Sequence, residues 1–249
     1  STMSFTAEAQ IVRELGKFLL DGSLYQGFKP VFWSTVEKTA LADAEVEYQD
    51  HTSNTIFVAF KVKESPKDFL KDFNIIIWTT TPWTIPANKA LAYNSSIEYS
   101  LVEINDLENF KEKKIVVATN LLDSIVKSCA IENFKILKTF NGSEFAGTIC
   151  KHPFETLDYN FDVPMLEARF VTLEQGTGIV HCAPSHGPDD FNLCLKHNIP
   201  SKYTIDNAGY YTDEIPYFTK THVFKADPIV IDKLKEVKKL LKNDKLQHS

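Results

Sequence analysis

The sequence predicts a mainly β fold with attached helices. Short segments rich in β-branched and aromatic residues recur along the 249 residues, and only a few stretches carry the spacing of a helical face. These segments do not alternate regularly with helices as βαβ units would, so a β-barrel or sandwich is favoured over a parallel α/β sheet. A hydrophobic content of 43% is enough to form one large domain, or one domain with appendages.

Helices are expected at both ends of the chain and at two places between them, one of which belongs to the second motif described below. Residues 5–20 form an amphipathic pattern in which the apolar residues Ile11, Val12, Leu15, Phe18 and Leu19 share one face. The same kind of spacing predicts helices over residues 121–130 and 227–241. Several lysines surround the last of these helices. They indicate a solvated surface, with contact to an RNA backbone as the alternative.

Extended structure is expected between these helices. The β-prone run at residues 74–81 is the strongest of these segments, because hydrophobic and β-branched residues follow one another there. Weaker patterns predict extended segments at residues 46–48, 56–62, 99–104, 114–118, 134–139, 168–173 and 178–182.

Charge and cysteine content argue against several classes of protein. A formal net charge of −6 does not suit a protein that grips nucleic acid by its overall field. The four cysteines are widely spaced without a CxxC pair, which favours free thiols over a disulfide framework or a zinc knuckle. Neither a run of about 20 apolar residues nor a secretory signal is evident, so the cytosol or an organelle matrix is the expected location.

The first segment with chemical interest is IWTTTPWTIPAN, residues 77–88, where a hydrophobic strand runs into four threonines. Pro82 and Pro86 cannot continue a central ladder, so the strand should end here and present hydroxyls in a restricted loop. Such hydroxyls suit recognition of an ester carbonyl, a ribose hydroxyl or a positioned water. The same threonines could instead serve as ordinary strand or turn residues.

The second segment is EQGTGIVHCAPSHGPDDF, residues 174–191, in which a glycine-flanked strand leads through a tight loop to a helix. Ser185 or Gly187 can cap this helix and Pro188 suits its first position. Asp189 and Asp190 then fall in the first turn, where free amides and the helix dipole favour a persistently ionised carboxylate. Such a group can anchor an ammonium ion, although capping alone would also explain both aspartates.

Other functions for this second segment are weaker. His181, Cys182, His186 and Asp190 match no zinc signature, and His181 and Cys182 should point to opposite sides of a strand. A cysteine protease built on Cys182 and His186 would lack the spatial triad that nucleophilic catalysis requires. The glycines precede a strand rather than follow one, so they do not form a phosphate-binding fingerprint.

Taken together, these segments resemble the connective-peptide editing domain of class I aminoacyl-tRNA synthetases, in its isoleucyl form. The similarity covers nearly the whole chain and includes KPVFWSTVEKTALADAEVEY, WTTTPWTIPANKAL, GTGIVHCAPSHGPDDF and HVFKADPIVIDKLKE. Valyl and leucyl relatives typically carry arginine where this chain has Thr81, and valyl enzymes carry lysine in place of His181. Some relatives have cysteine pairs in the incoming ribbon, where this chain has Ser34 and Glu37, which argues against zinc there.

The resemblance implies a β-barrel editing domain that deacylates valyl-tRNA(Ile), with valyl-adenylate as a second candidate substrate. Valine differs from isoleucine by one methylene, too little for one binding pocket to reject it well. By resemblance, Asp190 anchors the α-ammonium group and, with Thr80 and Thr81, forms the catalytic set. The substrate-binding set that it implies is Thr79, Trp83, Thr84, Asn88 and His181, with His181 and Thr84 limiting the size of the side-chain pocket.

The resemblance also implies an organisation into three parts and a set of partners. Residues 1–48 would form an arm entering from the host catalytic domain, residues 49–221 the editing barrel, and residues 222–249 an outgoing helix and return arm. The HIGH and KMSKS signatures of the ligase are absent from this sequence, so the ATP and Mg²⁺ of a full-length synthetase would bind elsewhere, and this part needs no metal or other cofactor. The expected partners are the 3′ end of tRNA(Ile) carrying valine and the rest of the synthetase, in a monomer without membrane contact.

Two other functional classes remain open at this point. A non-catalytic tRNA-binding module would retain tRNA without turnover, and the acidic balance of the chain disfavours it. A free-standing deacylase for another misacylated tRNA would not need the two arms. No obvious nucleophile stands out in either motif, so direct attack of an oriented water on the ester is the expected mechanism.

Overall fold

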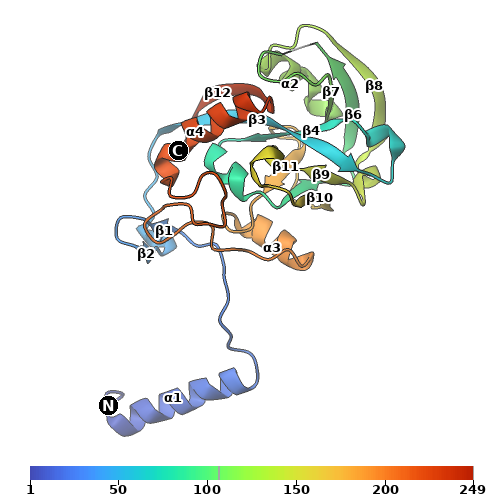
Figure 1. Cartoon of the computed structure of the whole chain (residues 1–249). Helices are drawn as coiled ribbons and strands as arrows, with labels where there is room; N and C mark the ends of the chain where they lie inside the picture. The colour runs from blue at the N-terminus through green and yellow to red at the C-terminus, as the bar shows by residue number, and fades with distance from the viewer. Residues whose placement is uncertain (106, 249) are drawn as a thin grey trace.

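Strand β3 (His51–Glu64) is the longest strand of a large mixed sheet in the computed structural model, which describes residues 1–105 and 107–248. The strands follow the order β11-β5-β10-β9-β3-β4-β7-β6-β8, and β12 pairs with β3 beside this path (Figure 1). Their bounds are β4 (Asn74–Thr79), β5 (Ala90–Tyr93), β6 (Glu98–Ile104), β7 (Lys114–Ala118), β8 (Phe134–Asn141), β9 (Ile149–Lys151), β10 (Asp162–Glu167), β11 (Ile179–Cys182) and β12 (Leu240–His248).

The core forms where β3 crosses the middle of the sheet. Every residue from Ile56 to Phe60 is buried, which means that both faces of the strand are covered. On its two edges β3 pairs antiparallel with β4, where Val58 lies opposite Ile77, and with β12, where Ile56 lies opposite Asn243. A near-continuous apolar run is typical of a strand covered on both faces, and the extended structure predicted for residues 56–62 lies within β3.

The prediction of a mainly β fold with attached helices is confirmed. The ladders of the described residues form an open path from β11 to β8 and do not close into a barrel. Most pairs are antiparallel, but β4 with β7 and β5 with β10 are parallel. Strand β11 also packs against β4, which brings the two predicted functional segments together at one end of the sheet.

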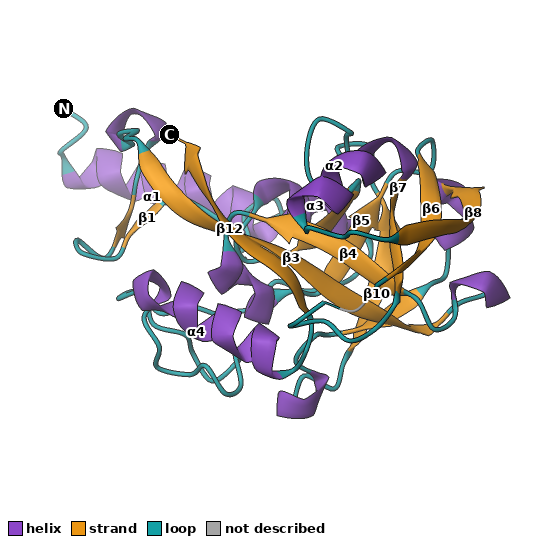
Figure 2. Cartoon of the chain, turned by 90° about the horizontal axis from the view of Figure 1, so that it is seen from above, coloured by secondary structure: helices purple, strands orange, loops and turns teal. Residues whose placement is uncertain are grey.

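The described residues form four α-helices: α1 (Phe5–Leu20), α2 (Leu122–Ser128), α3 (Pro188–Lys196) and α4 (Val223–Glu236) (Figure 2). Helix α4 packs against the short 3₁₀ segment Pro82–Ala87 that follows β4. No helix in the described part of the chain is long and apolar enough to cross a membrane.

Three predicted elements differ from the structure. The segment expected at residues 46–48 belongs to no strand, since β3 begins only at His51. The helix expected at residues 227–241 begins at Val223 and ends at Glu236. Lys238 then turns at φ 57°, and Leu240 starts β12, because the adjacent edge of β3 offers a complete ladder. The strand expected at residues 168–173 is wrong, and the strand β10 (Asp162–Glu167) precedes it. Pro164 within β10 hides the usual strand pattern because proline disfavours the interior of a ladder.

The two terminal arms differ in how they meet the sheet. Helix α1 lies apart from the rest and buries none of its residues (Figure 1). Further along the incoming arm, β1 (Trp33–Ser34) pairs with β2 (Thr39–Ala40), and the indole Nε1 of Trp33 donates to Asn207 O at 2.9 Å. Within this hairpin the Ser34 hydroxyl donates to the carboxylate of Glu37. The hairpin is therefore fastened to the loop at Asn207, while the return arm joins the main sheet as β12.

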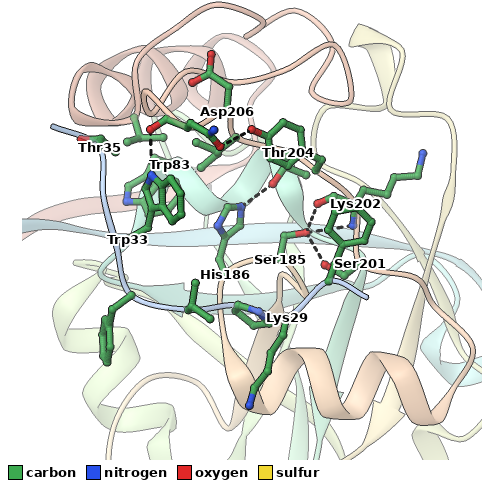
Figure 3. A pocket seen from close by; sticks show the side chains of 18 of the residues that line it. Lys29, Trp33, Thr35, Trp83, Ser185, His186, Ser201, Lys202, Thr204 and Asp206 are labelled. Carbon is green, nitrogen blue, oxygen red and sulfur yellow. Dashed lines mark hydrogen bonds between the residues drawn. The ribbon is translucent and has the colours of Figure 1, made fainter. Parts of the chain in front are cut away.

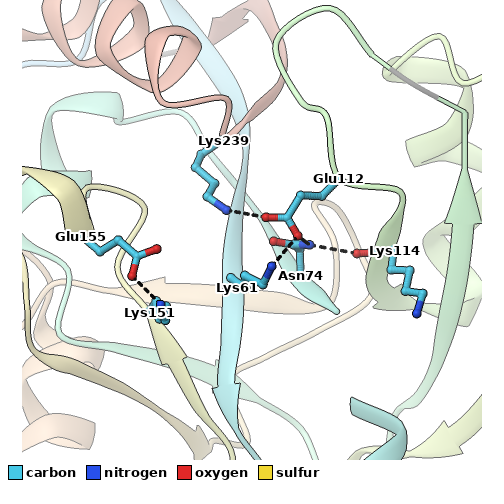
Figure 4. Close-up of polar contacts among 7 residues, drawn as sticks. All are labelled: Lys61, Asn74, Glu112, Lys114, Lys151, Glu155 and Lys239. Atoms are coloured by element: carbon cyan, nitrogen blue, oxygen red, sulfur yellow. Dashed lines mark hydrogen bonds and ion pairs between the residues drawn. The ribbon is translucent and has the colours of Figure 1, made fainter. Parts of the chain in front are cut away.

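The carboxylate of Glu112 ties the return arm to the centre of the sheet (Figure 4). It accepts hydrogen bonds from Lys239 Nζ at 2.9 Å, Asn74 Nδ2 at 2.8 Å and Lys61 Nζ at 3.2 Å. Burial acts to raise the pKa of Glu112, but these three hydrogen bonds outweigh it and lower the pKa to about 2. Glu112 therefore stabilises the fold at pH values above its usual pKa near 4.5, and this contribution is lost as the pH falls towards 2.

Replacing Glu112 with alanine should lower the free energy of unfolding by about 2 kcal/mol at pH 7, because it leaves the Lys239 ammonium group and the Asn74 amide without their partner. Urea unfolding at pH 7 measures this. The matched control is Glu155→Ala, which removes a pair with Lys151 on the surface and should cost less than about 0.5 kcal/mol. Equal losses in the two variants would contradict a structural role for Glu112.

Candidate active site

A pocket of about 250 Å³ opens where the end of β4 meets β11. Pro82 and Pro86 end the strand pattern as expected, and the chain turns into the 3₁₀ segment Pro82–Ala87. The second wall comes from β11 and the loop that leads into α3. The residues that line the pocket are Trp78, Thr79, Thr81, Trp83, Thr84, Val180, His181, Ala183, His186 and Asp190.

Asp190 brings a carboxylate to this pocket from the first turn of α3. Gly187 is the N-cap of that helix and Pro188 its first residue, as the sequence predicted. The Oδ2 atom of Asp190 accepts a hydrogen bond from the backbone N–H of Ala183 at 2.9 Å, which fixes the side chain over the loop. Among the described residues no group bonds its second oxygen, Oδ1.

The pKa of Asp190 is raised, against the direction expected from the helix N-terminus. Burial raises the pKa of Asp190 to about 6, the Ala183 N–H acts against this shift, and the neighbouring charge of Asp189 adds to it. The helix N-terminus stabilises negative charge, but loss of hydration outweighs that effect for a side chain that is mostly covered. The carboxylate is thus ionised at neutral pH and becomes protonated in mild acid.

His181 is a neutral wall of the pocket, held by two hydrogen bonds. Asn88 Nδ2 can only donate, and it lies 3.1 Å from His181 Nδ1, so that ring nitrogen accepts and Nε2 carries the proton. His181 Nε2 then donates to the Thr84 hydroxyl at 2.8 Å, and Thr84 donates to Thr81 O at 2.9 Å. Burial, together with the nearby His186, lowers the pKa of His181 to about 4. Both ring nitrogens are engaged, so His181 is a poor general base.

The threonine hydroxyls differ in whether their proton remains free to donate a hydrogen bond to a ligand. Thr84 uses its only proton on Thr81 O, so it shapes the wall and has no proton for a ligand. Thr79 accepts from the Thr81 N–H at 3.1 Å, which leaves the Thr79 proton free to donate. Thr81 also lines the pocket, and its hydroxyl lies 3.5 Å from that of Thr80. Thr79 and Thr81 are therefore the hydroxyls best placed to orient an ester or a water.

The structure brings together six of the eight predicted site residues: Asp190, Thr79, Thr81, Trp83, Thr84 and His181 line the pocket. The other two, Thr80 and Asn88, are not among its lining residues. The Thr80 hydroxyl lies 3.5 Å from that of Thr81, and Asn88 is fully buried behind His181, where its Nδ2 also donates to Ala90 O. Asn88 thus supports the pocket through the histidine ring, whereas the resemblance implied that it binds substrate.

Four residues that line the pocket were not predicted from the sequence as part of it: Trp78, Val180, Ala183 and His186. Trp78 and Val180 neighbour Thr79 and His181 in their strands, so strand alternation would direct them to the opposite faces and does not predict them. The position of His186 depends on the loop between β11 and α3, and no pattern in the sequence specifies that loop conformation.

The described residues support neither a metal site nor a nucleophilic cysteine at this pocket. Within the ranges 1–105 and 107–248, His, Cys, Asp and Glu side chains form no group of three that could hold a metal ion. The thiol of Cys182 is fully buried, and burial, with Asp190 and Cys194 nearby, raises its pKa well above the usual value. A thiol in this state is a poor nucleophile.

The fold belongs to a known class of domains. It is similar to the cytosolic leucyl-tRNA synthetase editing domain of P. falciparum, with a TM-score of 0.55 at 13% identity over 79% of this chain and 99% of that one. The corresponding editing domain of P. knowlesi gives a TM-score of 0.54 at 11% identity, over 75% of this chain and 94% of that one. This chain thus has the fold of synthetase editing domains.

Sequence comparison gives the family. The model of the tRNA synthetases class I (I, L, M and V) matches residues 1–247, so the chain belongs to this family. It is 66% identical to an isoleucine--tRNA ligase of Pelagibacter ubique, over all of this chain and 28% of that protein. It is 46% identical to the isoleucine--tRNA ligase of Gluconobacter oxydans, over 98% of this chain and 26% of that protein. The chain therefore spans about a quarter of the length of these relatives.

Proposed function

We propose that this chain removes valine from wrongly charged isoleucine tRNA by hydrolysing the aminoacyl ester. The observation that carries the proposal is the meeting of Asp190 with the threonine strand end in one pocket. A carboxylate attracts the α-ammonium group of an amino acid, and the hydroxyls beside it suit an ester carbonyl or a water. The isoleucine--tRNA ligase relatives favour isoleucine tRNA as the carrier.

In the proposed reaction, Asp190 binds the ammonium group of the valyl ester and so fixes the ester near Thr79 and Thr81. A water attacks the ester carbonyl, the bond to the ribose oxygen breaks, and that oxygen leaves with a proton. The products are valine and tRNA with a free 3′-terminal hydroxyl. Orientation of water and ester supplies the rate increase, since no strong base faces the pocket, and a ribose hydroxyl of the tRNA can assist the proton transfer. His181, Thr84 and Trp83 limit the size of the acyl group.

The proposal also includes the setting of the chain. Its partners are the 3′ end of tRNA(Ile) and the remaining synthetase chain, in a monomer located in the bacterial cytosol or an organelle matrix. The apolar face of α1, with Leu15 and Phe18 exposed, offers surface to that remaining chain. The ATP and Mg²⁺ of aminoacylation would bind outside these residues, and valyl-adenylate is a second candidate substrate.

Incubation of the chain with valyl-tRNA(Ile) and isoleucyl-tRNA(Ile) tests the function. We expect valine to be released at least about tenfold faster than isoleucine, because the pocket wall must reject one methylene. Retention of tRNA without release of either amino acid would indicate a non-catalytic binding module. Preferential release of a different amino acid from its own tRNA would indicate a deacylase of another specificity.

A further inference from the structure

A second hollow lies directly behind two walls of the candidate active site. It has a volume of about 420 Å³ and is formed by the incoming arm (Phe28 to Thr35), the loop 201–207 and the start of α4 (Figure 3). Trp83 and His186 line both this hollow and the active-site pocket. The two side chains thus form a partition with space on each side, and Trp83 also packs against the hydrophobic core.

Polar ties hold this partition in place. The backbone N–H of Trp83 donates to Asp227 Oδ1 at 3.1 Å, and the Tyr211 hydroxyl donates to the carbonyl of Trp83. His186 Nε2 and Thr204 Oγ1 share a hydrogen bond of 3.0 Å, which Figure 3 shows on the side of the second hollow. The rings of Trp83 and His186 then meet edge to face, with centroids 4.9 Å apart.

We propose that Tyr211 and Thr204 are positioning residues that determine which acyl groups the active site accepts, by holding Trp83 and His186 as a partition between the two hollows. The inference rests on the proposed function and extends it to residues outside the pocket. Without these ties the partition can move into the space behind it. The active site then gains room for the additional methylene of isoleucine, and discrimination falls while hydrolysis continues.

Tyr211→Phe and Thr204→Val each remove one tie with little change in volume. The measurement is the ratio of kcat/KM for isoleucine release to that for valine release from tRNA(Ile). We expect this ratio to rise about tenfold in each variant, with kcat for valine changed less than about threefold, since one methylene is worth at least about tenfold in a closed pocket. Thr204→Ser keeps the hydroxyl and should keep the wild-type ratio.

Tyr159→Phe is the matched control. Tyr159 is as buried as Tyr211, and its hydroxyl likewise donates to a backbone carbonyl, that of Pro216 at 2.8 Å, but it touches neither Trp83 nor His186 through that bond. Thermal unfolding of all variants shows whether a comparable loss of stability accompanies each change. Only the variants that remove a hydrogen bond of the partition should change the ratio of the two kcat/KM values.

The possible outcomes distinguish a failure of the positioning role from a failure of the proposed function. A selective wild-type chain whose Tyr211→Phe and Thr204→Val variants keep the wild-type ratio contradicts the positioning role alone. The positioning role is likewise contradicted if Tyr159→Phe raises the ratio as much as Tyr211→Phe does. A wild-type chain that releases neither amino acid contradicts the proposed function, and the inference with it.

Discussion

Asp190→Asn should lower kcat/KM for valine release on the order of 100-fold at pH 8, because an amide cannot neutralise the ammonium group of the bound valyl ester. The variant keeps an oxygen that can accept the Ala183 N–H, so the loop into α3 should retain its conformation. Burial raises the pKa of Asp190, which means that the folded state disfavours the charged carboxylate. The variant should therefore unfold at the same temperature as the wild type, or at a higher one, at pH 8.

The same pKa predicts the pH dependence of the wild type. Only the ionised carboxylate binds an ammonium group, so kcat/KM should rise with pH through about 6 and then level off. Asp189→Asn is the control, since Asp189 is exposed on the same helical turn and does not line the pocket. It should keep activity within about twofold. Near-normal valine release by Asp190→Asn would show that another group holds the ammonium.

Gly178→Ala should lower the free energy of unfolding by about 3 kcal/mol. Gly178 stands just before β11 with φ 74°, a backbone conformation that costs an alanine about 1 kcal/mol. An added Cβ would lie 2.4 Å from the Cβ of Ala118, so β7 or β11 would also have to shift, at a cost of about 2 kcal/mol. Urea unfolding, monitored by circular dichroism, gives the change.

The variant Gly176→Ala separates the cost of the backbone conformation from the cost of the close contact. Gly176 has a similar φ of 82°, but an added Cβ would meet Trp78 at 3.6 Å, an ordinary contact. This variant should lose only about 1 kcal/mol, the cost of the backbone conformation. If both alanines cost the same, the close approach of Gly178 to Ala118 makes no contribution to the packing of β11.

Several elements could be predicted because their cause is local. Helix α1 follows from the spacing of its apolar residues, β4 from its β-branched run, and the start of α3 from Pro188 after Gly187. The strand β10 and the end of α4 could not be predicted in this way. A partner strand overrides local preference in both places, since β10 tolerates Pro164 and β12 completes the edge of β3.

The features of the candidate site can also be separated into those with a local cause and those that depend on the tertiary structure. The residue types of Thr79 and Asp190 suggested recognition of an ester and an ammonium group, whereas the role of His181 followed only from the resemblance to editing domains. The packing of β11 against β4 decided which of these side chains share a pocket. It placed Asn88 behind His181 and brought His186 beside Trp83, contacts between residues far apart in the sequence.

The sequence by itself determined the β-rich class, the two motifs and the kinds of side chain available for chemistry, because these depend on residue identity and short-range spacing. The tertiary structure alone decided the direction of the pKa shift of Asp190, since burial raises this pKa against the effect of the helix N-terminus. It also decided that Trp83 and His186 form a wall with space behind it. Burial and cavity shape arise from the whole fold, so no local pattern in the sequence encodes them.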